Sequence, residues 1–190
     1  MKKIGVYSGS FNPIHVGHLM LANYIVEFSD LDEIWFIVSP QNPLKKKEDL
    51  LDDYERLKMV QMAIDDYSRF SVNDIEFSMP IPSYTIDTLE KLSKTYPYKF
   101  VFICGMDSIQ NIDKWKDYKK ILDNYELLVC PRKGYDGGEF VNHPSVTVLP
   151  VPIVEISSTF IRNSIKENKD VRYFMPEKVY NYIKTNKLYV

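Results

Sequence analysis

Short apolar runs alternate with helical patterns along most of this chain, and this alternation restricts the possible folds more than any other feature. Strand-like runs cover residues 3–9, 33–40, 70–77, 99–105 and 145–151, and residues 123–132 contain the end of a helix followed by another strand. Between them, apolar side chains recur at the helical period over residues 16–28, 52–66 and 84–96. Strands that alternate with helices form βαβ units, with parallel strands and helices on both faces. The sequence therefore predicts an α/β fold with an open, doubly wound, mostly parallel sheet.

The chain changes character after residue 155, where helical patterns follow one another without strands. These patterns cover residues 158–168 and 176–186. No internal repeat, low-complexity segment or linker interrupts the sequence. We therefore expect a single domain over residues 1–190, with an α/β core over 1–155 and a C-terminal helical part over 156–190.

Charge and composition exclude several classes of function. The formal net charge is -2, so the chain lacks the overall positive field that nucleic-acid binding requires. No apolar run approaches the roughly 18 residues that cross a bilayer, and Met1 leads directly into a strand-like run, so we expect a cytoplasmic protein with no membrane partner. Cys104 and Cys130 lie within apolar runs, which predicts buried thiols on neighbouring strands. With 3 His and 2 Cys, a structural zinc site is not expected.

The stretch "SGSFNPIHVGH", residues 8–18, joins the first strand to the first helix. In a doubly wound sheet, ligands bind at the carboxyl ends of the strands. Gly9 and Ser10 allow a close turn with amide groups available for an oxyanion, and His15 and His18 share one face of the first helical turn. Charged imidazoles there cost up to about 1 kcal/mol against the helix dipole. This cost is understandable if the site binds an anion, so the stretch predicts a phosphate site.

Two other interpretations of these histidines remain open. They can be partly buried side chains that cap the helix, which is the usual role of an isolated histidine. They can also be metal ligands, although no Cys or carboxylate stands near them in the sequence.

The stretch "ISSTFIR", residues 156–162, begins a second helix without an acid. Ser157, Ser158 and Thr159 supply hydroxyl and amide groups there, as N-cap residues do. An ordinary cap is the alternative interpretation, but no Glu or Gln completes a capping box, and Arg162 stands in the first turn instead. Two helix starts suited to anions predict that both stretches converge on one polyphosphate.

Together, "GSFNPIHVGH" and "ISSTFIR" resemble the signature of the nucleotidyltransferases that carry HxGH and ISSTxxR motifs. The rest of the chain resembles the bacterial nicotinate-nucleotide adenylyltransferases in the stretches "PQNPLKK", "PSYTIDTL", "CGMDSIQNIDKW" and "CPRKG". The resemblance covers nearly the whole chain, with one departure, since many members have His where Leu44 stands here. It implies a Rossmann-like nucleotidyltransferase fold. It also implies transfer of the adenylyl group of ATP to nicotinate mononucleotide, giving nicotinate adenine dinucleotide and pyrophosphate.

The resemblance implies roles for the residues that would bind ATP. The catalytic residues would be His15, His18 and Arg162, with His18 at the α-phosphate in the transition state. Further contacts to ATP would come from Gly9, Ser10, Phe11, Gly105, Asp107, Ser157, Ser158 and Thr159. Asp107 follows a strand, where acids in doubly wound folds accept hydrogen bonds from ribose. Its alternative role is the N-cap of the next helix.

The same resemblance implies a site for the second substrate. The nicotinate ring would stack on Trp115, and its carboxylate would be held at Tyr84 and Thr85. Thr85 is predicted as the N-cap of the helix that begins near residue 86, and Trp115 is alternatively a core aromatic. Lys45, which lies nearest the end of its strand, and Arg132 are predicted to bind the mononucleotide phosphate, and Asn42 is predicted to shape the same pocket.

The expected reaction needs no general base, because a phosphate monoester is largely ionised at pH 7 with a second pKa of about 6. Mg²⁺ is expected to arrive with ATP, since no carboxylate cluster offers it a protein cage. The expected partners are ATP and nicotinate mononucleotide, and homo-oligomerisation is left open. The alternatives are a different acceptor (phosphopantetheine or nicotinamide mononucleotide) and a nucleotide-binding regulatory module without turnover. An aminoacyl-tRNA synthetase, which can carry a similar histidine turn, is disfavoured by the length of this chain.

Overall fold

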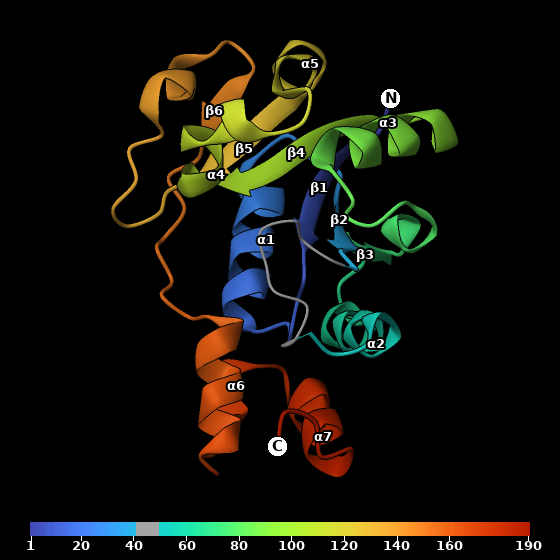
Figure 1. Ribbon diagram of the computed structural model, residues 1–190, viewed down its shortest axis with the longest axis vertical. Helices are drawn as coiled ribbons and strands as arrows, with labels where there is room; N and C mark the ends of the chain where they lie inside the picture. Colours follow the sequence, from blue (N-terminus) through green and yellow to red (C-terminus); the bar gives the residue numbers. More distant parts are fainter. Residues whose placement is uncertain (41–49) are drawn as a thin grey trace.

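A computed structural model describes residues 1–40 and 50–190 of the chain. These residues form a six-stranded sheet in which neighbouring strands are parallel (Figure 1). The strands are β1 (Lys3–Gly9), β2 (Glu33–Val38), β3 (Phe70–Asn73), β4 (Lys99–Gly105), β5 (Glu126–Cys130) and β6 (Val146–Val148). Their order is β3-β2-β1-β4-β5-β6, so the direction of winding reverses between β1 and β4. The carboxyl ends of these two strands mark the expected ligand position.

Helices cover both faces of the sheet, as the alternating pattern predicts. One core contains buried side chains of α1 (Val16–Phe28) and α2 (Asp53–Ile64). The opposite core contains those of α3 (Thr85–Thr95), α4 (Met106–Gln110) and α5 (Tyr118–Asn124). Strand β2 shows why, since Ile34 and Phe36 face the first core whereas Trp35 and Ile37 face the second. The predicted doubly wound fold is confirmed.

The helices after residue 155 extend the first core. They are α6 (Ser158–Lys166) and α7 (Glu177–Thr185), which contribute Ile161, Val179 and Ile183 to it. Figure 1 shows both at the lower end of the molecule, with the start of α6 near the start of α1. The histidine-bearing start of α1 and the arginine-bearing start of α6 are therefore neighbours in space.

Two predicted strands are markedly shorter than expected. β6 covers only Val146–Val148 of the predicted run 145–151, and β3 also ends early. The pattern predicts a strand over residues 70–77, but β3 ends at Asn73 and residues Ile75–Ser78 form the 3₁₀ helix η2. The reason is local, because the Asn73 side chain accepts a hydrogen bond from the Ile75 N–H at 2.8 Å, an alternative to continuing the ladder. The other 3₁₀ helices described are η3 (Ile112–Lys114), η4 (Gly138–Asn142) and η5 (Arg172–Phe174).

Two further expectations concern cysteines and membranes. Cys104 and Cys130 are free and buried on the paired strands β4 and β5, as predicted. Over residues 1–40 and 50–190, no helix combines the length and apolarity needed to cross a bilayer.

Candidate active site

A cavity of about 890 Å³ opens where the turn after β1, the ends of β4 and β5, and the start of α6 meet. It is lined by residues from both stretches singled out in the sequence, although these lie more than a hundred positions apart. The predicted site residues among its lining are Ser10, His15, His18, Gly105, Arg132, Ser157, Ser158, Thr159 and Arg162. The cavity therefore gathers most of the residues predicted to bind ATP.

The two imidazoles at the start of α1 stack on each other, with ring centroids 3.7 Å apart and planes at 23°. His18 Nδ1 accepts a hydrogen bond from the His15 backbone N–H at 3.2 Å. Because a neutral imidazole carries one proton, this bond assigns the proton of neutral His18 to Nε2. His18 can thus cap its own helix with one nitrogen and donate with the other.

His15 is held as a neutral side chain. It is 4% exposed, and burial lowers its pKa from the ordinary value to about 4. Its Nδ1 atom is buried and makes no standard hydrogen bond to the described residues, but it faces Gly17 in the first turn of its own helix, where the His15 side chain and the His18 backbone N–H stand in a capping-box arrangement. The helix-capping interpretation is therefore supported for both histidines, and it is compatible with a ligand in the cavity that both of them line.

Gly17, between the histidines, is a site residue that the sequence analysis did not single out. A Cβ atom on Gly17 would lie 3.0 Å from His15 Nδ1 and 3.1 Å from His15 Cε1, closer than ordinary packing allows. The missing side chain therefore makes room for the His15 ring. The glycine of the HxGH motif itself was the available signal.

The start of α6 is fastened directly to the turn after β1. Ser158 Oγ donates to the Pro13 carbonyl at 2.9 Å, and Arg162 Nη1 donates to the Asn12 carbonyl at 2.9 Å. Ser157 Oγ accepts from the Phe160 N–H at 3.2 Å, so Ser157 is an N-cap, the alternative that the sequence left open. The two predicted anion sites form one continuous structure.

Asn12 is a second residue that the sequence analysis missed. It is buried, and its Oδ1 accepts from the Leu51 N–H at 3.3 Å and from the Tyr189 hydroxyl at 2.8 Å. No sequence signal connects these positions, because the contact joins segments at opposite ends of the chain.

Gly9 ends β1, and Phe11 is buried with φ of 43°, so these two predicted residues shape the turn from within.

Gly105, Asp107 and Arg132 form one unit at the ends of β4 and β5. Arg132 Nε lies 3.2 Å from Asp107 Oδ1. A Cβ atom on Gly105 would lie 2.4 Å from Asp107 Oδ1 and 2.8 Å from Arg132 Nε, so any larger residue at this position would displace at least one of the two charged groups. The alternative role of Asp107 as an N-cap is wrong, because Gly105 occupies that position and Asp107 lies inside the first turn of α4.

Two cysteine thiols beside this unit are protonated at neutral pH. Cys104 and Cys130 both line the cavity. Burial raises the pKa of Cys130 to about 12 and raises that of Cys104 further. Both remain protonated at neutral pH, so neither is a nucleophile.

The residues predicted for the nicotinate group lie away from the cavity lining. Tyr84 is the N-cap of α3, so the prediction that Thr85 caps this helix is wrong by one position. The reason is that the Tyr84 carbonyl already accepts the Thr88 N–H at 3.1 Å, which starts the helical ladder at residue 85.

Trp115 is half-buried and packs edge-on against Phe102 of β4, with ring centroids 5.9 Å apart. It thus combines core packing, the alternative interpretation, with a partly exposed ring. Lys116 connects this segment to α3, because its Nζ lies 2.8 Å from Asp87 and 5.2 Å from the Tyr84 ring centroid. The predicted residues Asn42 and Lys45, and also Leu44, lie outside the described residues.

Within the described ranges, no cluster of three or more His, Cys, Asp or Glu side chains could hold a metal ion. The donors at the cavity are chiefly amides, hydroxyls, imidazoles and guanidinium groups. Such donors suit phosphate oxygens better than a cation.

Comparison with known proteins places this geometry in a family. A family model described as cytidylyltransferase-like matches residues 6–188. A "probable nicotinate-nucleotide adenylyltransferase" of Flavobacterium johnsoniae is 51% identical, with 98% of each chain covered. The protein of the same name in Flavobacterium psychrophilum is 48% identical, again with 98% of each chain covered.

A solved structure shows the same fold. It is a Plasmodium falciparum nicotinic acid mononucleotide adenylyltransferase complexed with NaAD, with a TM-score of 0.84, 24% identity, and coverage of 100% of this chain and 98% of that one. The six-stranded parallel sheet with helices on both faces is therefore the nucleotidyltransferase fold. The chain belongs to the cytidylyltransferase-like family and, within it, to the nicotinate-nucleotide adenylyltransferases.

Proposed function

We propose that this chain transfers the adenylyl group of ATP to nicotinate mononucleotide. A phosphate oxygen of the mononucleotide attacks the α-phosphorus of ATP. The bond from that phosphorus to the bridging oxygen breaks, and pyrophosphate leaves with the electron pair. The observation that carries the proposal is the fastening of the Arg162 helix to the histidine turn around one cavity.

In this proposal the residues act by position and charge rather than by covalent chemistry. His18 donates from Nε2 to the α-phosphate as charge develops there, and neutral His15 lies against it. Ser158, Thr159 and Arg162 contact the β- and γ-phosphates. Stabilisation of developing charge by donors already in place is a large term in phosphoryl transfer.

Gly9, Ser10 and Phe11 are proposed to contact ATP through the backbone of the turn, and Ser157 through the start of α6. Asp107 is proposed to accept from a ribose hydroxyl, with Gly105 allowing the close approach. Mg²⁺ is proposed to enter bound to ATP and to keep phosphate and water ligands. The donor set at the cavity supports this division, because it offers hydrogen bonds to oxygen anions.

The acceptor is proposed to bind beside the ATP site. Tyr84, Thr85 and Trp115 would hold the nicotinate group. Arg132 and Lys45 would hold the mononucleotide phosphate, and Asn42 would shape the same pocket. The position of Arg132 on the cavity lining supports a phosphate role. Four expectations from the sequence remain part of the proposal: the chain is a single domain, it is cytoplasmic, it has no nucleic-acid or membrane partner, and its oligomeric state is open.

Pyrophosphate release tests the proposal. The purified chain is supplied with ATP, Mg²⁺ and one of three acceptors: nicotinate mononucleotide, nicotinamide mononucleotide or phosphopantetheine. We expect the highest kcat/KM with nicotinate mononucleotide. A preference for phosphopantetheine would overturn the proposal, and binding of ATP without pyrophosphate release would identify a regulatory module.

A further inference from the structure

An arginine in α2 is fully buried next to the site, although no role has been assigned to it. Arg56 is 0% exposed. It lies on the apolar stripe of its helix, at helical spacing from Met59, Val60 and Ala63. Burial of a cation is unfavourable unless the charge is paired and its donors are satisfied. The hydrogen-bond partners of this guanidinium therefore show which segments of the chain it connects.

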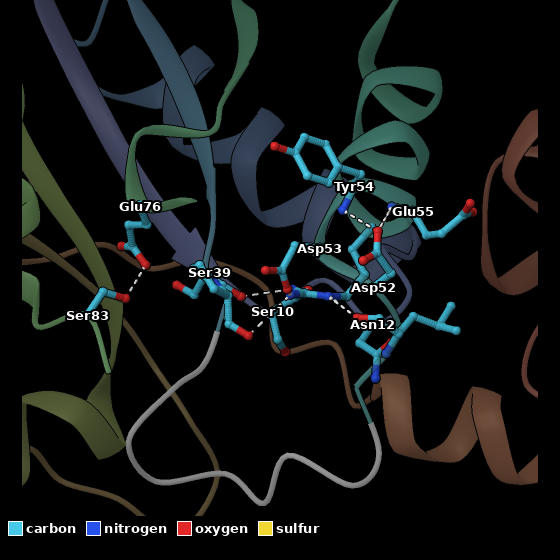
Figure 2. A network of polar contacts seen from close by, with 12 residues as sticks. Ser10, Asn12, Ser39, Asp52, Asp53, Tyr54, Glu55, Glu76 and Ser83 are labelled. Carbon is cyan, nitrogen blue, oxygen red and sulfur yellow. Dashed lines mark hydrogen bonds and ion pairs between the residues drawn. The ribbon is translucent and has the colours of Figure 1, made fainter. Parts of the chain in front are cut away.

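Each of the five N–H groups of Arg56 has an acceptor within reach. Nε donates to the Leu51 carbonyl at 3.0 Å. Nη1 donates at 2.6 Å to the carbonyl of Ser10 and at 2.9 Å to that of Ser39, and Nη2 donates at 3.4 Å to the carbonyl of Pro40 and at 2.5 Å to Asp53 Oδ1. Figure 2 shows Ser10, Ser39 and Asp53 close to one another, and all three accept hydrogen bonds from Arg56. Since a guanidinium carries five donors, Arg56 joins the turn after β1, the end of β2 and the start of α2.

The contact to Ser10 controls the direction of an amide group in the histidine turn. The Ser10 carbonyl and the Phe11 N–H belong to one planar, trans peptide group, so they point in opposite directions. With the carbonyl drawn toward α2, the Phe11 N–H is directed away from α2. Phe11 has φ of 43°, a left-handed conformation that is unfavourable for a residue with a side chain. Arg56 thus holds a strained peptide in place.

The same peptide positions a proposed catalytic side chain. The Phe11 ring is buried and meets the His18 ring edge-on, with centroids 5.1 Å apart. A rotation of the Ser10–Phe11 peptide would therefore displace both a backbone donor and the ring that supports His18. We infer that Arg56 is a positioning residue for adenylyl transfer, which keeps the Phe11 N–H and His18 aligned with the triphosphate. This inference rests on the proposed function.

Arg69 provides a control with the same kinds of partner, although its side chain is 35% exposed. Its Nε donates to the Asp32 carbonyl at 3.0 Å and its Nη2 to the Leu31 carbonyl at 2.5 Å, and Nη1 pairs with Glu27 at 3.2 Å. It thus also joins two carbonyls and a carboxylate. These contacts lie at the amino end of β2, whereas those of Arg56 lie at the carboxyl ends of β1 and β2. Arg56→Lys and Arg69→Lys both keep the charge and lose the planar fork.

The experiment separates positioning from simple stability. For both variants we measure the melting temperature, kcat, both KM values and the Kd of a methylene-bridged ATP analogue. The stoichiometry of analogue binding gives the number of folded sites, by which kcat is divided. We expect Arg56→Lys to lower kcat by about tenfold to a hundredfold per folded site. We also expect the analogue Kd to rise and the KM for nicotinate mononucleotide to stay within about threefold. Arg69→Lys should lower the melting temperature and leave kcat within about twofold of wild type.

Two results would overturn the inference: a wild-type kcat per folded site in Arg56→Lys, or an equal loss of kcat in Arg69→Lys. If Arg56→Lys does not fold, Asp53→Ala replaces it, because the Asp53 side chain is 35% exposed and its loss removes one contact of Arg56. We expect Asp53→Ala to lower kcat by about twofold to fivefold, and an unchanged kcat would then refute the inference. If wild-type protein does not use nicotinate mononucleotide, the proposed function fails, and the analogue Kd still tests Arg56.

Discussion

The two ring nitrogens of His18 are predicted to have separate roles, and two substitutions distinguish them. Nδ1 accepts the His15 N–H at 3.2 Å, whereas Nε2 is proposed to donate to the α-phosphate. In His18→Asn, the side-chain oxygen occupies nearly the position of Nδ1, so the cap survives and the Nε2 donor is lost. In His18→Ala, both are lost. The ring and its packing disappear in both variants, so a comparison of the two cancels that contribution.

The expected magnitudes follow from the kind of contact removed. Loss of one donor to charge in the transition state lowers kcat by about 10²–10³, or roughly 2.7–4 kcal/mol, and this loss is expected in both variants. Loss of an N-cap contact destabilises a protein by about 1 kcal/mol, and this loss is expected only in His18→Ala. The two variants should therefore share a low kcat and differ in their free energy of unfolding.

Pyrophosphate release at saturating ATP and nicotinate mononucleotide measures kcat, and urea denaturation measures the free energy of unfolding. KM for the mononucleotide should change little, because the proposed contact strengthens only in the transition state. A kcat for His18→Asn within threefold of wild type (about 0.7 kcal/mol) would refute the role of Nε2. Equal stabilities of the two variants would refute the role of Nδ1.

Three further predictions concern the residues around the histidines. Gly17→Ala puts a Cβ atom 3.0 Å from His15 Nδ1, so kcat should fall on the order of tenfold while the helix propensity of Ala offsets up to about 1 kcal/mol of strain; a wild-type kcat contradicts this. Because burial lowers the pKa of His15 to about 4, the unfolded chain alone gains this proton as pH falls below about 6.5. The contribution of neutral, buried His15 to the free energy of unfolding is therefore complete above that pH. In urea titrations, the free energy of unfolding of wild type should fall by about 2 kcal/mol more than that of His15→Gln between pH 7 and pH 5; parallel pH profiles of the two proteins would exclude this. Gly105→Ala puts a Cβ atom 2.4 Å from Asp107 Oδ1, which separates it from Arg132, and should raise KM for at least one nucleotide about tenfold; two unchanged KM values would count against it.

The fold was predictable because its signals are local. Alternation with a period of two or of about 3.6 residues is a property of neighbouring side chains, and it identifies strands such as β1 and helices such as α1 within a residue of their ends. The end of β3 escaped this pattern, because one hydrogen bond from the Ile75 N–H to the Asn73 side chain turns the chain out of the ladder. Periodicity reports which face is apolar and carries no information on a single competing polar contact.

The site was predictable where chemistry is unusual for its local position. Imidazoles and an arginine at helix starts contradict the helix dipole, so His15, His18 and Arg162 stood out. Asn12 and Arg56 did not, because, apart from the Asp53 carboxylate beside Arg56, their partners are backbone carbonyls, a hydroxyl and an amide, which any sequence supplies. Arg56 had one visible signal, a cation on the apolar stripe of α2. Such a residue is buried only when distant backbone groups satisfy it.

The bonds that hold the histidine turn span nearly the whole chain, and this has a consequence for synthesis. Arg162 and Tyr189 reach Asn12 across 150 and 177 positions. At a translation rate of about 5–20 residues per second, Tyr189 follows Asn12 by roughly 9–35 s. Contacts of such high sequence separation form late in folding. A nascent chain thus acquires the complete turn only after α6 and α7 have been made, so any ligand binding that depends on this turn must wait for both helices.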